Sequence, residues 1–374
     1  MKFVVSCSSL LSQLQTIGRV IASKNSIPVL DCFLFELKGN KLTLTAADTE
    51  TRMVTSIEVA DVVGEGVFAI PSKNLLESLK ELPDQPVTFD INDESLELSI
   101  SYENGKYNFV AQNGAEYPQP KPLNDGAANL FLPSSVLLMG ISRSLFAVAD
   151  DELRPVMNGI FLDITTEDVT FVASDGHKLV RFKSLSVKGE ERASFILPKK
   201  PANLLRTVLP KESGEVKISF DDSNAYITLE NFVIISRLIE GRYPNYNAVI
   251  PTDNPYKVTI DRLVLLNALK RVVVFSNPAS SLVKLSISSN SILISTQDID
   301  FSTAAEETVS CVYDGSDMSI GFKGIFLIEM LNNNTSSEIV LELADSSKAG
   351  LVLPVENEED EDLLMLLMPM MIAD

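Results

Sequence analysis

The single histidine of the chain, His177, lies in the segment SDGHKL, two residues after Asp175. An aspartate that orients a histidine is typical of acid–base catalysis, and the neighbouring Ser174 carries a hydroxyl that could act as the nucleophile. The motifs that usually accompany such chemistry, GxSxG, the P-loop, HExxH and GxGxxG, are absent from the sequence. The acidic pairs at 150–151 and 221–222 look like turn residues. We therefore expect no catalytic residues and no enzyme.

The metal-binding residue types are also sparse. Cys7, Cys32 and Cys311 lie far apart and form no CxxC pair, and one histidine cannot supply a typical zinc site. We expect neither a metal nor a cofactor. An odd number of separated cysteines fits a reducing compartment better than a secreted disulfide framework. No apolar run reaches the ~18 residues of a membrane span, so the prediction is a cytoplasmic protein without a membrane segment.

The elements that must position these residues recur three times along the chain. Each copy begins with an amphipathic helical stretch and an apolar strand, and continues with a strand that ends at a polar turn containing Asp48, Asp175 or Asp298. A strand, a second helix and alternating strands follow. In the first helix Leu10, Leu14, Ile17 and Ile21 recur at helical spacing, and Ser8 or Ser9 is the expected N-cap. The helices are expected at 9–24, 72–82, 134–150, 199–209, 261–275 and 322–331.

Each copy is the size of a domain, so the period is too long for a solenoid. The Pro-rich segments YPQPKPLNDGAAN and VIPTDNPYK mark the boundaries. They predict domains at 1–125, 126–253 and 254–374. Because a one-faced sheet has to bury that face, each pair of helices should cover antiparallel sheets. The predicted fold class is α+β, with three repeated domains.

Charge is distributed unevenly between these elements. The 374 residues include 31 Lys and Arg and 51 Asp and Glu, a net charge of −20 that on average disfavours nucleic acid. The six helical segments, however, hold 12 basic and only 5 acidic residues. This excess of basic residues could reflect only the readiness of helix surfaces to accept Lys and Arg, although they accept Glu equally well. The alternative interpretation is that the helices form a surface that contacts a polyanion, while the acidic sheets face outward. The basic residues are Arg19, Lys24, Lys73, Lys80, Arg143, Lys199, Lys200, Arg206, Arg262, Lys270, Arg271 and Lys323.

Four segments in fixed order, LTLTAADTETRM, VASDGHKL, EGRYPNY and MPM, make the chain resemble the bacterial sliding-clamp family, the β subunits of DNA polymerase III. The likeness covers nearly the whole chain. It implies a head-to-tail homodimeric ring of six domains that encircles double-stranded DNA without sequence specificity. It also implies a non-catalytic processivity factor that tethers the replicative DNA polymerase. The further partners implied are the clamp loader and repair and translesion proteins.

The resemblance places the dimer contact between domain one of one chain and domain three of the other. The matching positions are Phe109 and Ala111 on one side and Val274 and Phe275 on the other, although Phe109 and Phe275 could also be core residues. Four acidic residues near Val274 and Phe275 could face Lys73 or Lys106. They are Asp298, Asp300, Glu306 and Glu307.

The end of the chain, LLMLLMPMMIAD, is apolar and follows the acidic run 356–362, whose role the sequence does not reveal. It could be a buried last strand, but Met suits adaptable binding surfaces and Pro369 blocks ladder pairing. The resemblance implies a groove between domains two and three that binds short apolar peptide motifs, for which partners compete. Asn247, Ala248 and Met371 stand where the family often has basic residues, and Ala373 and Asp374 extend the chain. The matching positions are Met157, Ser174, Gly176, His177, Lys178, Leu179, Pro244, Val249, Leu366, Leu367, Met368, Pro369 and Met370.

A second function remains open from the sequence. The chain could be an acidic, β-rich interaction scaffold that does not bind DNA. This alternative predicts no loss of function when Lys24, Lys199, Lys200 and Arg206 are changed to Glu, whereas a clamp should then load poorly, and more so as salt rises.

Overall fold

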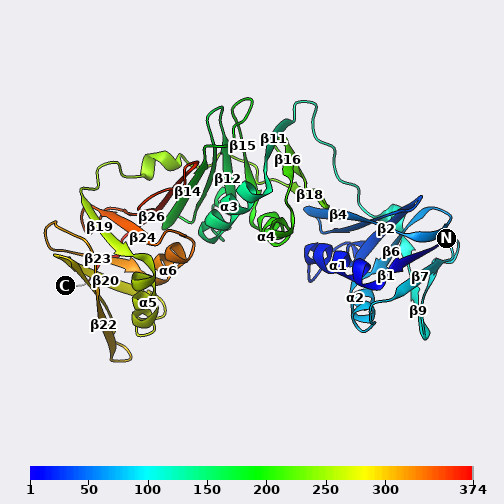
Figure 1. Ribbon diagram of the computed structural model, residues 1–374, viewed down its shortest axis with the longest axis horizontal. Coiled ribbons are helices and arrows are strands. Elements are labelled where there is room, and N and C mark those ends of the chain that lie inside the picture. Colours follow the sequence, from blue (N-terminus) through cyan, green and yellow to red (C-terminus); the bar gives the residue numbers. More distant parts are fainter. Residues whose placement is uncertain (373–374) are drawn as a thin grey trace. The chain divides into compact units, whose positions relative to one another are not determined.

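The computed structural model describes residues 1–372 of the chain. Within them the backbone forms six α-helices and 26 strands, which are labelled in Figure 1 where there is room. The contacts divide the chain into two compact units. The first unit contains Met1–Leu137 and Asn203–Leu238, and the second contains Leu138–Ala202 and the chain from Ile239 onward. The middle third of the chain thus contributes to both units.

The helices occur in three pairs, one pair in each third of the chain. They are α1 (Cys7–Ile17), α2 (Ser72–Lys80), α3 (Ser134–Ser144), α4 (Lys199–Val208), α5 (Arg262–Val273) and α6 (Gly324–Asn332).

The strands of the first unit are β1 (Lys2–Ser6), β2 (Cys32–Lys38), β3 (Lys41–Ala47), β4 (Thr51–Glu58), β5 (Ala60–Val63), β6 (Gly66–Pro71), β7 (Pro86–Ile91), β8 (Glu97–Tyr102), β9 (Gly105–Val110), β10 (Gln112–Asn113), β11 (Ala128–Pro133), β16 (Glu215–Phe220), β17 (Asn224–Thr228) and β18 (Phe232–Arg237). Those of the second unit are β12 (Gly159–Ile164), β13 (Val169–Ser174), β14 (Lys178–Ser184), β15 (Ala193–Pro198), β19 (Tyr256–Asp261), β20 (Leu282–Ser288), β21 (Ser291–Asp298), β22 (Thr303–Ser310), β23 (Met318–Lys323), β24 (Glu338–Leu343), β25 (Gly350–Pro354) and β26 (Glu361–Leu367).

Antiparallel pairing joins these strands into four sheets. In the first unit the orders are β5-β1-β7-β8-β9 and β10-β6-β2-β3-β4-β18-β17-β16-β11. In the second they are β15-β12-β13-β14-β26-β25-β24-β19 and β22-β21-β20-β23. The two longest sheets each join strands of neighbouring repeats, through β4 and β18 in one and through β14 and β26 in the other. We call these two junctions the first seam and the second seam.

Apolar side chains at regular spacing fix the helices on the sheets. In α1, Leu10, Leu14 and Ile17 are fully buried, as their spacing predicts. Strand β20 buries every second residue, which is the period of a strand with one face on the core. The prediction of an α+β fold, with helix pairs on antiparallel sheets in three repeats, is confirmed.

Two helices end more than a full turn earlier than the sequence predicts, whereas α2, α4 and α5 end one or two residues early. Helix α1 stops at Ile17 and gives way to a 3-10 turn, Gly18–Val20, because glycine is a poor helix former. Ile21 and Lys24 therefore lie beyond the helix. Helix α3 stops at Ser144 before a second 3-10 turn. The N-cap of α1 is Ser6 rather than Ser8 or Ser9, and its hydroxyl accepts a hydrogen bond from the Ser9 N–H at 3.3 Å.

Candidate functional site

The turn that carries His177 is held by its own polar side chains. The Asp175 carboxylate accepts hydrogen bonds from the backbone N–H groups of His177 and Lys178, both at 2.9 Å. Gly176 adopts a φ of +89°, a conformation that favours glycine. The Ser174 hydroxyl donates to the Lys178 carbonyl at 2.9 Å and so is not paired with the imidazole. These groups build a turn and form no nucleophile–base pair.

Lys178, which follows this turn, is a buried cation at the start of β14. Its Nζ lies 2.5 Å from Oε2 of Glu329 on α6 and 3.6 Å from Oδ2 of Asp175. The same Nζ lies 4.0 Å from the centroid of the Phe326 ring. A buried ammonium group requires such partners, because leaving it unpaired away from water is costly. Lys178 therefore ties the turn to α6.

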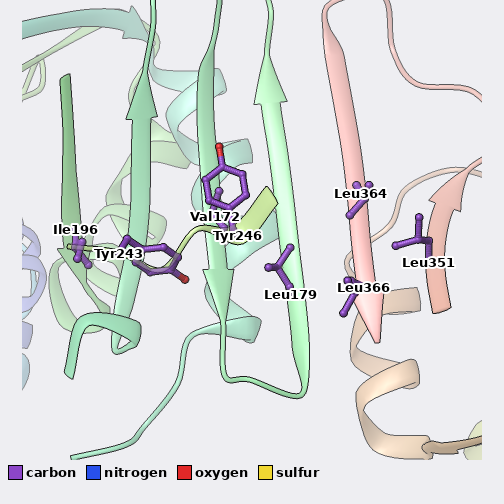
Figure 2. Close-up of a cluster of buried hydrophobic side chains, with 8 residues drawn as sticks. All are labelled: Val172, Leu179, Ile196, Tyr243, Tyr246, Leu351, Leu364 and Leu366. Carbon is purple, nitrogen blue, oxygen red and sulfur yellow. The ribbon is translucent and has the colours of Figure 1, made fainter. Parts of the chain in front are cut away.

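An apolar cluster occupies the second seam beside this turn, as Figure 2 shows. Leu179 of β14 is the cross-strand partner of Leu366 of β26, and both are buried. The segment after the second repeat packs on the same cluster through Tyr243, whose ring stacks on Phe161 with the centroids 4.8 Å apart. Burial raises the pKa of the Tyr243 phenol.

All of the predicted peptide-site residues lie in the second unit. The N–H of Met368 donates to the His177 carbonyl at 2.8 Å, and Met370 forms a bridge with Gly321, so the tail after β26 is held in place.

Residues Asn247, Ala248 and Met371 are exposed, and Ala373 and Asp374 lie outside the described residues. Of the peptide-site residues, the buried ones are Met157, Ser174, Lys178, Leu179, Leu366 and Leu367, the exposed ones are Gly176, His177, Pro244, Val249 and Met368, and Pro369 and Met370 are half-buried.

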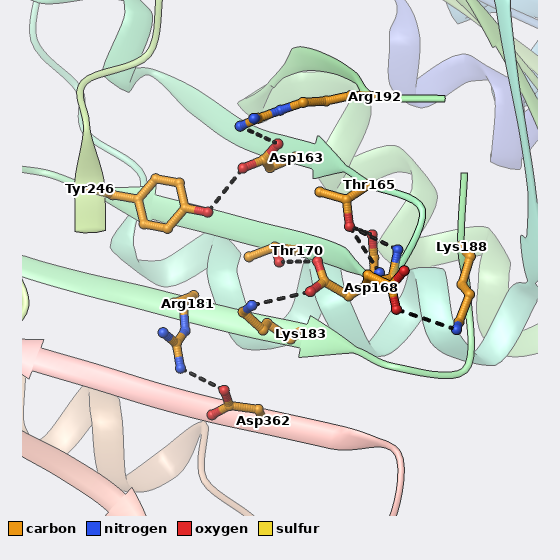
Figure 3. Close-up of polar contacts among 11 residues, drawn as sticks. Asp163, Thr165, Asp168, Thr170, Arg181, Lys183, Lys188, Arg192, Tyr246 and Asp362 are labelled. Atoms are coloured by element: carbon orange, nitrogen blue, oxygen red, sulfur yellow. Dashed lines mark hydrogen bonds and ion pairs between the residues drawn. The ribbon is translucent and has the colours of Figure 1, made fainter. Parts of the chain in front are cut away.

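Ion pairs also close the second seam. Arg181 of β14 lies 2.6 Å from the carboxylate of Asp362 on β26, as Figure 3 shows. Arg143 of α3 lies 2.8 Å from Glu361 and stacks over the Phe182 ring at 5.0 Å. The last two residues of the acidic run 356–362 thus have a structural role in this seam.

The predicted DNA-facing cations fall into two groups. Arg143, Arg262 and Arg271 have intramolecular partners: Arg143 pairs with Glu361, Arg262 donates to the carbonyls of Ser336 and Leu331, and Arg271 pairs with Glu307. Arg206 donates to the Asn203 side chain, and Lys323 lies over the Phe326 ring. Lys199 and Lys200 also make contacts. Those that are exposed and have no ion pair within residues 1–372 are Arg19, Lys24, Lys73, Lys80 and Lys270.

The predicted dimer residues lie on or near two edge strands, β9 and β22, and at the end of α5. Strand β9, which carries Phe109, is the edge of the five-stranded sheet, and β22 is the edge of the four-stranded sheet. Phe109 is half-buried and Ala111 is buried. Val274 and Phe275 are exposed at the end of α5, where the Thr303 hydroxyl donates to the Phe275 carbonyl.

The acidic residues beside β22 differ in their availability. Asp298 is 3% exposed, and its carboxylate accepts from the N–H groups of Asp300 and Phe301 to hold a turn. Glu307 pairs with Arg271, whose guanidinium lowers the pKa of that carboxyl. Asp300 and Glu306 are exposed.

The same turn carries two exposed apolar residues that were not predicted from the sequence. Ile299 is 81% exposed and Phe301 is 74% exposed. The repeat contained the signal, because Thr49 and Gly176 occupy the position of Ile299 in the first two copies. Contiguous exposed apolar patches, rather than single side chains, are typical of interaction surfaces, and Ile299 and Phe301 lie two residues apart on one turn.

The repeated architecture and its exposed sheet edges define a sliding clamp. Models of the DNA polymerase III beta subunit match the chain at residues 1–121 (N-terminal domain), 131–245 (central domain) and 247–371 (C-terminal domain). The beta sliding clamp of Haemophilus influenzae is 28% identical over 376 residues, which cover 99% of this chain and 100% of that protein. That of Pseudomonas aeruginosa is 27% identical over 366 residues, covering 98% and 99%. The chain therefore belongs to the DNA polymerase III beta subunit family.

Solved structures agree with this membership. A crystal structure of the sliding clamp from Bartonella birtlesii, bound to griselimycin, superposes over the whole of both chains with a TM-score of 0.93 and 26% identity. The family consists of non-catalytic processivity factors of DNA polymerase, which confirms the predicted function. No helix within residues 1–372 has the length and apolar character to cross a lipid bilayer.

Proposed function

We propose that two copies of this chain close head to tail into a ring around duplex DNA and tether the replicative polymerase to it. The observation that carries this proposal is a set of exposed cations that form no ion pair within residues 1–372, in a chain whose net charge is −20. They are Lys73 and Lys80 on α2, Lys270 on α5 and Arg19 in the 3-10 turn that follows α1. Cations of this kind contact phosphates without reading sequence, so DNA is held loosely and can move.

The size of such a ring fits a duplex. Two copies with six helices each supply twelve helices to an inner wall. Helices packed about 10 Å apart give a circumference on the order of 120 Å, and a clear opening of roughly 28 Å after helix radii of ~5 Å. A B-form duplex is about 20 Å across. The remaining space leaves room for water.

The dimer contact of this proposal joins the edge strand β9 of one copy to the edge strand β22 of the other. Unpaired N–H and C=O groups on an edge strand readily pair with another chain. The exposed apolar side chains Val274, Phe275, Ile299 and Phe301 lie beside β22 and would be covered by the contact. We call these four residues the dimer patch. The acids Asp300 and Glu306 are then available to Lys73 or Lys106 of the other copy.

The second seam is the proposed site for the peptide motifs of the polymerase, the clamp loader and repair and translesion proteins. Pro244 and Val249 are exposed and adjoin in sequence Tyr243 and Ile250, which pack in the apolar cluster of the second seam. Exposed Met368 directly follows β26, the strand that carries the buried Leu366 of that cluster. Deleting residues 368–374 should abolish binding of a polymerase peptide while dimerisation is retained. Unchanged peptide affinity, measured by fluorescence polarisation, would refute this placement.

The domain boundaries 1–125, 126–253 and 254–374 and a cytoplasmic location complete the proposal. The Pro-rich segments near 118–122 and 251–255 support the boundaries. Membership in a family of bacterial replication proteins supports the location.

Charge reversal tests the DNA-binding surface. The triple variant Arg19→Glu, Lys73→Glu and Lys80→Glu should load poorly onto DNA, and the defect should grow between 50 and about 200 mM salt. The control reverses Lys38 and Lys41, two exposed cations of β2 and β3 in the same unit. If the helix variant and the control load alike, the chain is an acidic scaffold rather than a DNA clamp.

A further inference from the structure

The first seam contains a pocket of about 380 Å³. Strands β2, β3, β4 and β18 line it together with the segment that follows the first repeat. Leu34, Val54 and Ile235 give it apolar walls, and Arg52 and Glu36 are its charged residues. All of these residues belong to the first unit.

The internal repeat relates this pocket to the apolar cluster of the second seam. The offset that takes Asp48 to Asp175 also takes Leu34 to Phe161, and Arg52 to Leu179. Arg52 pairs across the first seam with Ile235, as Leu179 pairs across the second seam with Leu366. The two seams therefore share the same strand pairing, but Arg52 in the first seam occupies the position of Leu179 in the second. A ligand of the first seam must satisfy that charge.

Arg52 has no carboxylate partner among the described residues, 1–372. Its guanidinium lies 5.5 Å from the centroid of the Tyr117 ring, and burial lowers its pKa. Within residues 1–372 the Arg52 side chain makes no hydrogen bond or ion pair, and Glu36 in the same pocket forms none with it. A half-buried guanidinium with free donors can donate two parallel hydrogen bonds to one carboxylate.

The segment that follows the first repeat forms one wall of the pocket, and contacts with the rest of the first unit hold this segment in position. A Cβ on Gly114 would come within 2.7 Å of the Phe68 backbone nitrogen, so this segment lies directly against β6. The Tyr117 hydroxyl donates to the Cys32 carbonyl at 3.4 Å, and the Tyr226 hydroxyl donates to the Lys121 carbonyl at 2.7 Å. A preformed pocket reduces the ordering cost of binding.

We propose that this pocket binds an extended peptide of a partner protein that presents a carboxylate side chain next to an apolar one. The carboxylate pairs with Arg52, and the apolar side chain packs between Val54 and Ile235. A single cation beside Glu36 in a chain of net charge −20 disfavours nucleic acid as the ligand. This site goes beyond the proposed function, since it gives the clamp a second peptide site with a different preference.

The test compares two capped peptides, acetyl-Leu-Asp-Leu-amide and acetyl-Leu-Asn-Leu-amide, on the full chain. Methyl NMR signals of Val54 and Ile235 report occupancy of the first seam, and those of Val249 and Leu366 report the second. We expect the Asp peptide to shift Val54 and Ile235 and to bind about tenfold more tightly than the Asn peptide, because a charge-assisted hydrogen bond is lost in the latter.

Variants identify the residue responsible. Arg52→Gln should remove the preference for the Asp peptide. Arg52→Lys keeps the positive charge but loses the bidentate geometry of the guanidinium, so it should retain part of this preference. Lys38→Gln, on the exposed side of β2, is the matched control and should keep the full preference. Deletion of residues 368–374 should leave this binding unchanged, which separates it from the peptide site of the second seam.

Three results would overturn the proposal. The first is the absence of shifts at Val54 and Ile235, or shifts confined to Val249 and Leu366. The second is a preference that survives Arg52→Gln. The third is displacement of the peptide by an equal concentration of inorganic phosphate, which would show that the pocket is a simple anion site.

Discussion

Three buried tyrosines hold the segments that join the repeats. Tyr117 lies in the first of these segments, and Tyr243 and Tyr246 lie in the second. Burial raises the pKa of Tyr117 to about 12 and that of Tyr246 to about 12, while the Tyr246 hydroxyl donates to Asp163 at 3.1 Å. Each phenol therefore stays protonated in the folded chain at a pH where it ionises in the unfolded chain.

This difference predicts a loss of stability in alkali. The stabilisation is fully present below pH ~10, the ordinary pKa of tyrosine, and is lost as the pH rises from there to about 12. The free energy of unfolding should fall by about 1.4 kcal/mol per pH unit for each buried phenol. In the Tyr117→Phe variant the free energy of unfolding should fall less steeply with pH, because the contribution of one phenol is absent. Urea unfolding between pH 9 and 11.5 measures this slope. An identical slope in the variant would contradict the assignment.

At the scale of elements, the ion pair between Arg143 and Glu361 joins α3 to β26 at the second seam. Both side chains are largely buried, so removal of one leaves an uncompensated charge. Glu361→Ala should lower the free energy of unfolding by about 3 kcal/mol. Glu359→Ala, in the exposed part of the same acidic run, should change it by less than about 0.5 kcal/mol. Equal effects in urea unfolding would show that the pair has no special role.

The edge strand β22 and the dimer patch predict how the ring can be opened. Phe275→Arg places a charge in the proposed contact and should weaken the dimer by at least about a hundredfold. Val312→Arg is the control, because Val312 is also exposed and apolar but lies outside the dimer patch. Sedimentation velocity distinguishes monomer from dimer. A Phe275→Arg protein that stays dimeric would remove this surface from the contact.

At the scale of the whole molecule, the sequence predicts the repeated elements better than their connections. Helical spacing and the recurring turn aspartates reveal three copies, because these signals are local. The seams arise from pairing between strands far apart in the chain, and the residues alone do not reveal which edges meet. Arg143 illustrates this limit: its charge and helical position predict a DNA contact, whereas its partner Glu361 becomes evident only when β26 lies beside β14.

The candidate site residues likewise include some that the sequence predicts and others that it does not indicate. The family resemblance predicts the peptide-site residues, and two of them, Leu179 and Leu366, belong to the apolar cluster of the second seam. Ile299, Phe301 and Arg52 were missed because each is unusual only by comparison with the matching positions of the other copies. The burial of Asp298, likewise, depends on a turn whose hydrogen bonds no residue pattern displays.

Retention on DNA with and without free ends tests the central claim, that the molecule encircles its substrate. Labelled protein is loaded onto a nicked circular plasmid, and its half-life on the DNA is compared before and after a single cut linearises the plasmid. A ring should stay on the circle at least about tenfold longer and be lost through the ends of the linear form, even in salt that weakens phosphate contacts. Equal half-lives on the two forms would show that the protein binds DNA by contact alone and does not surround it.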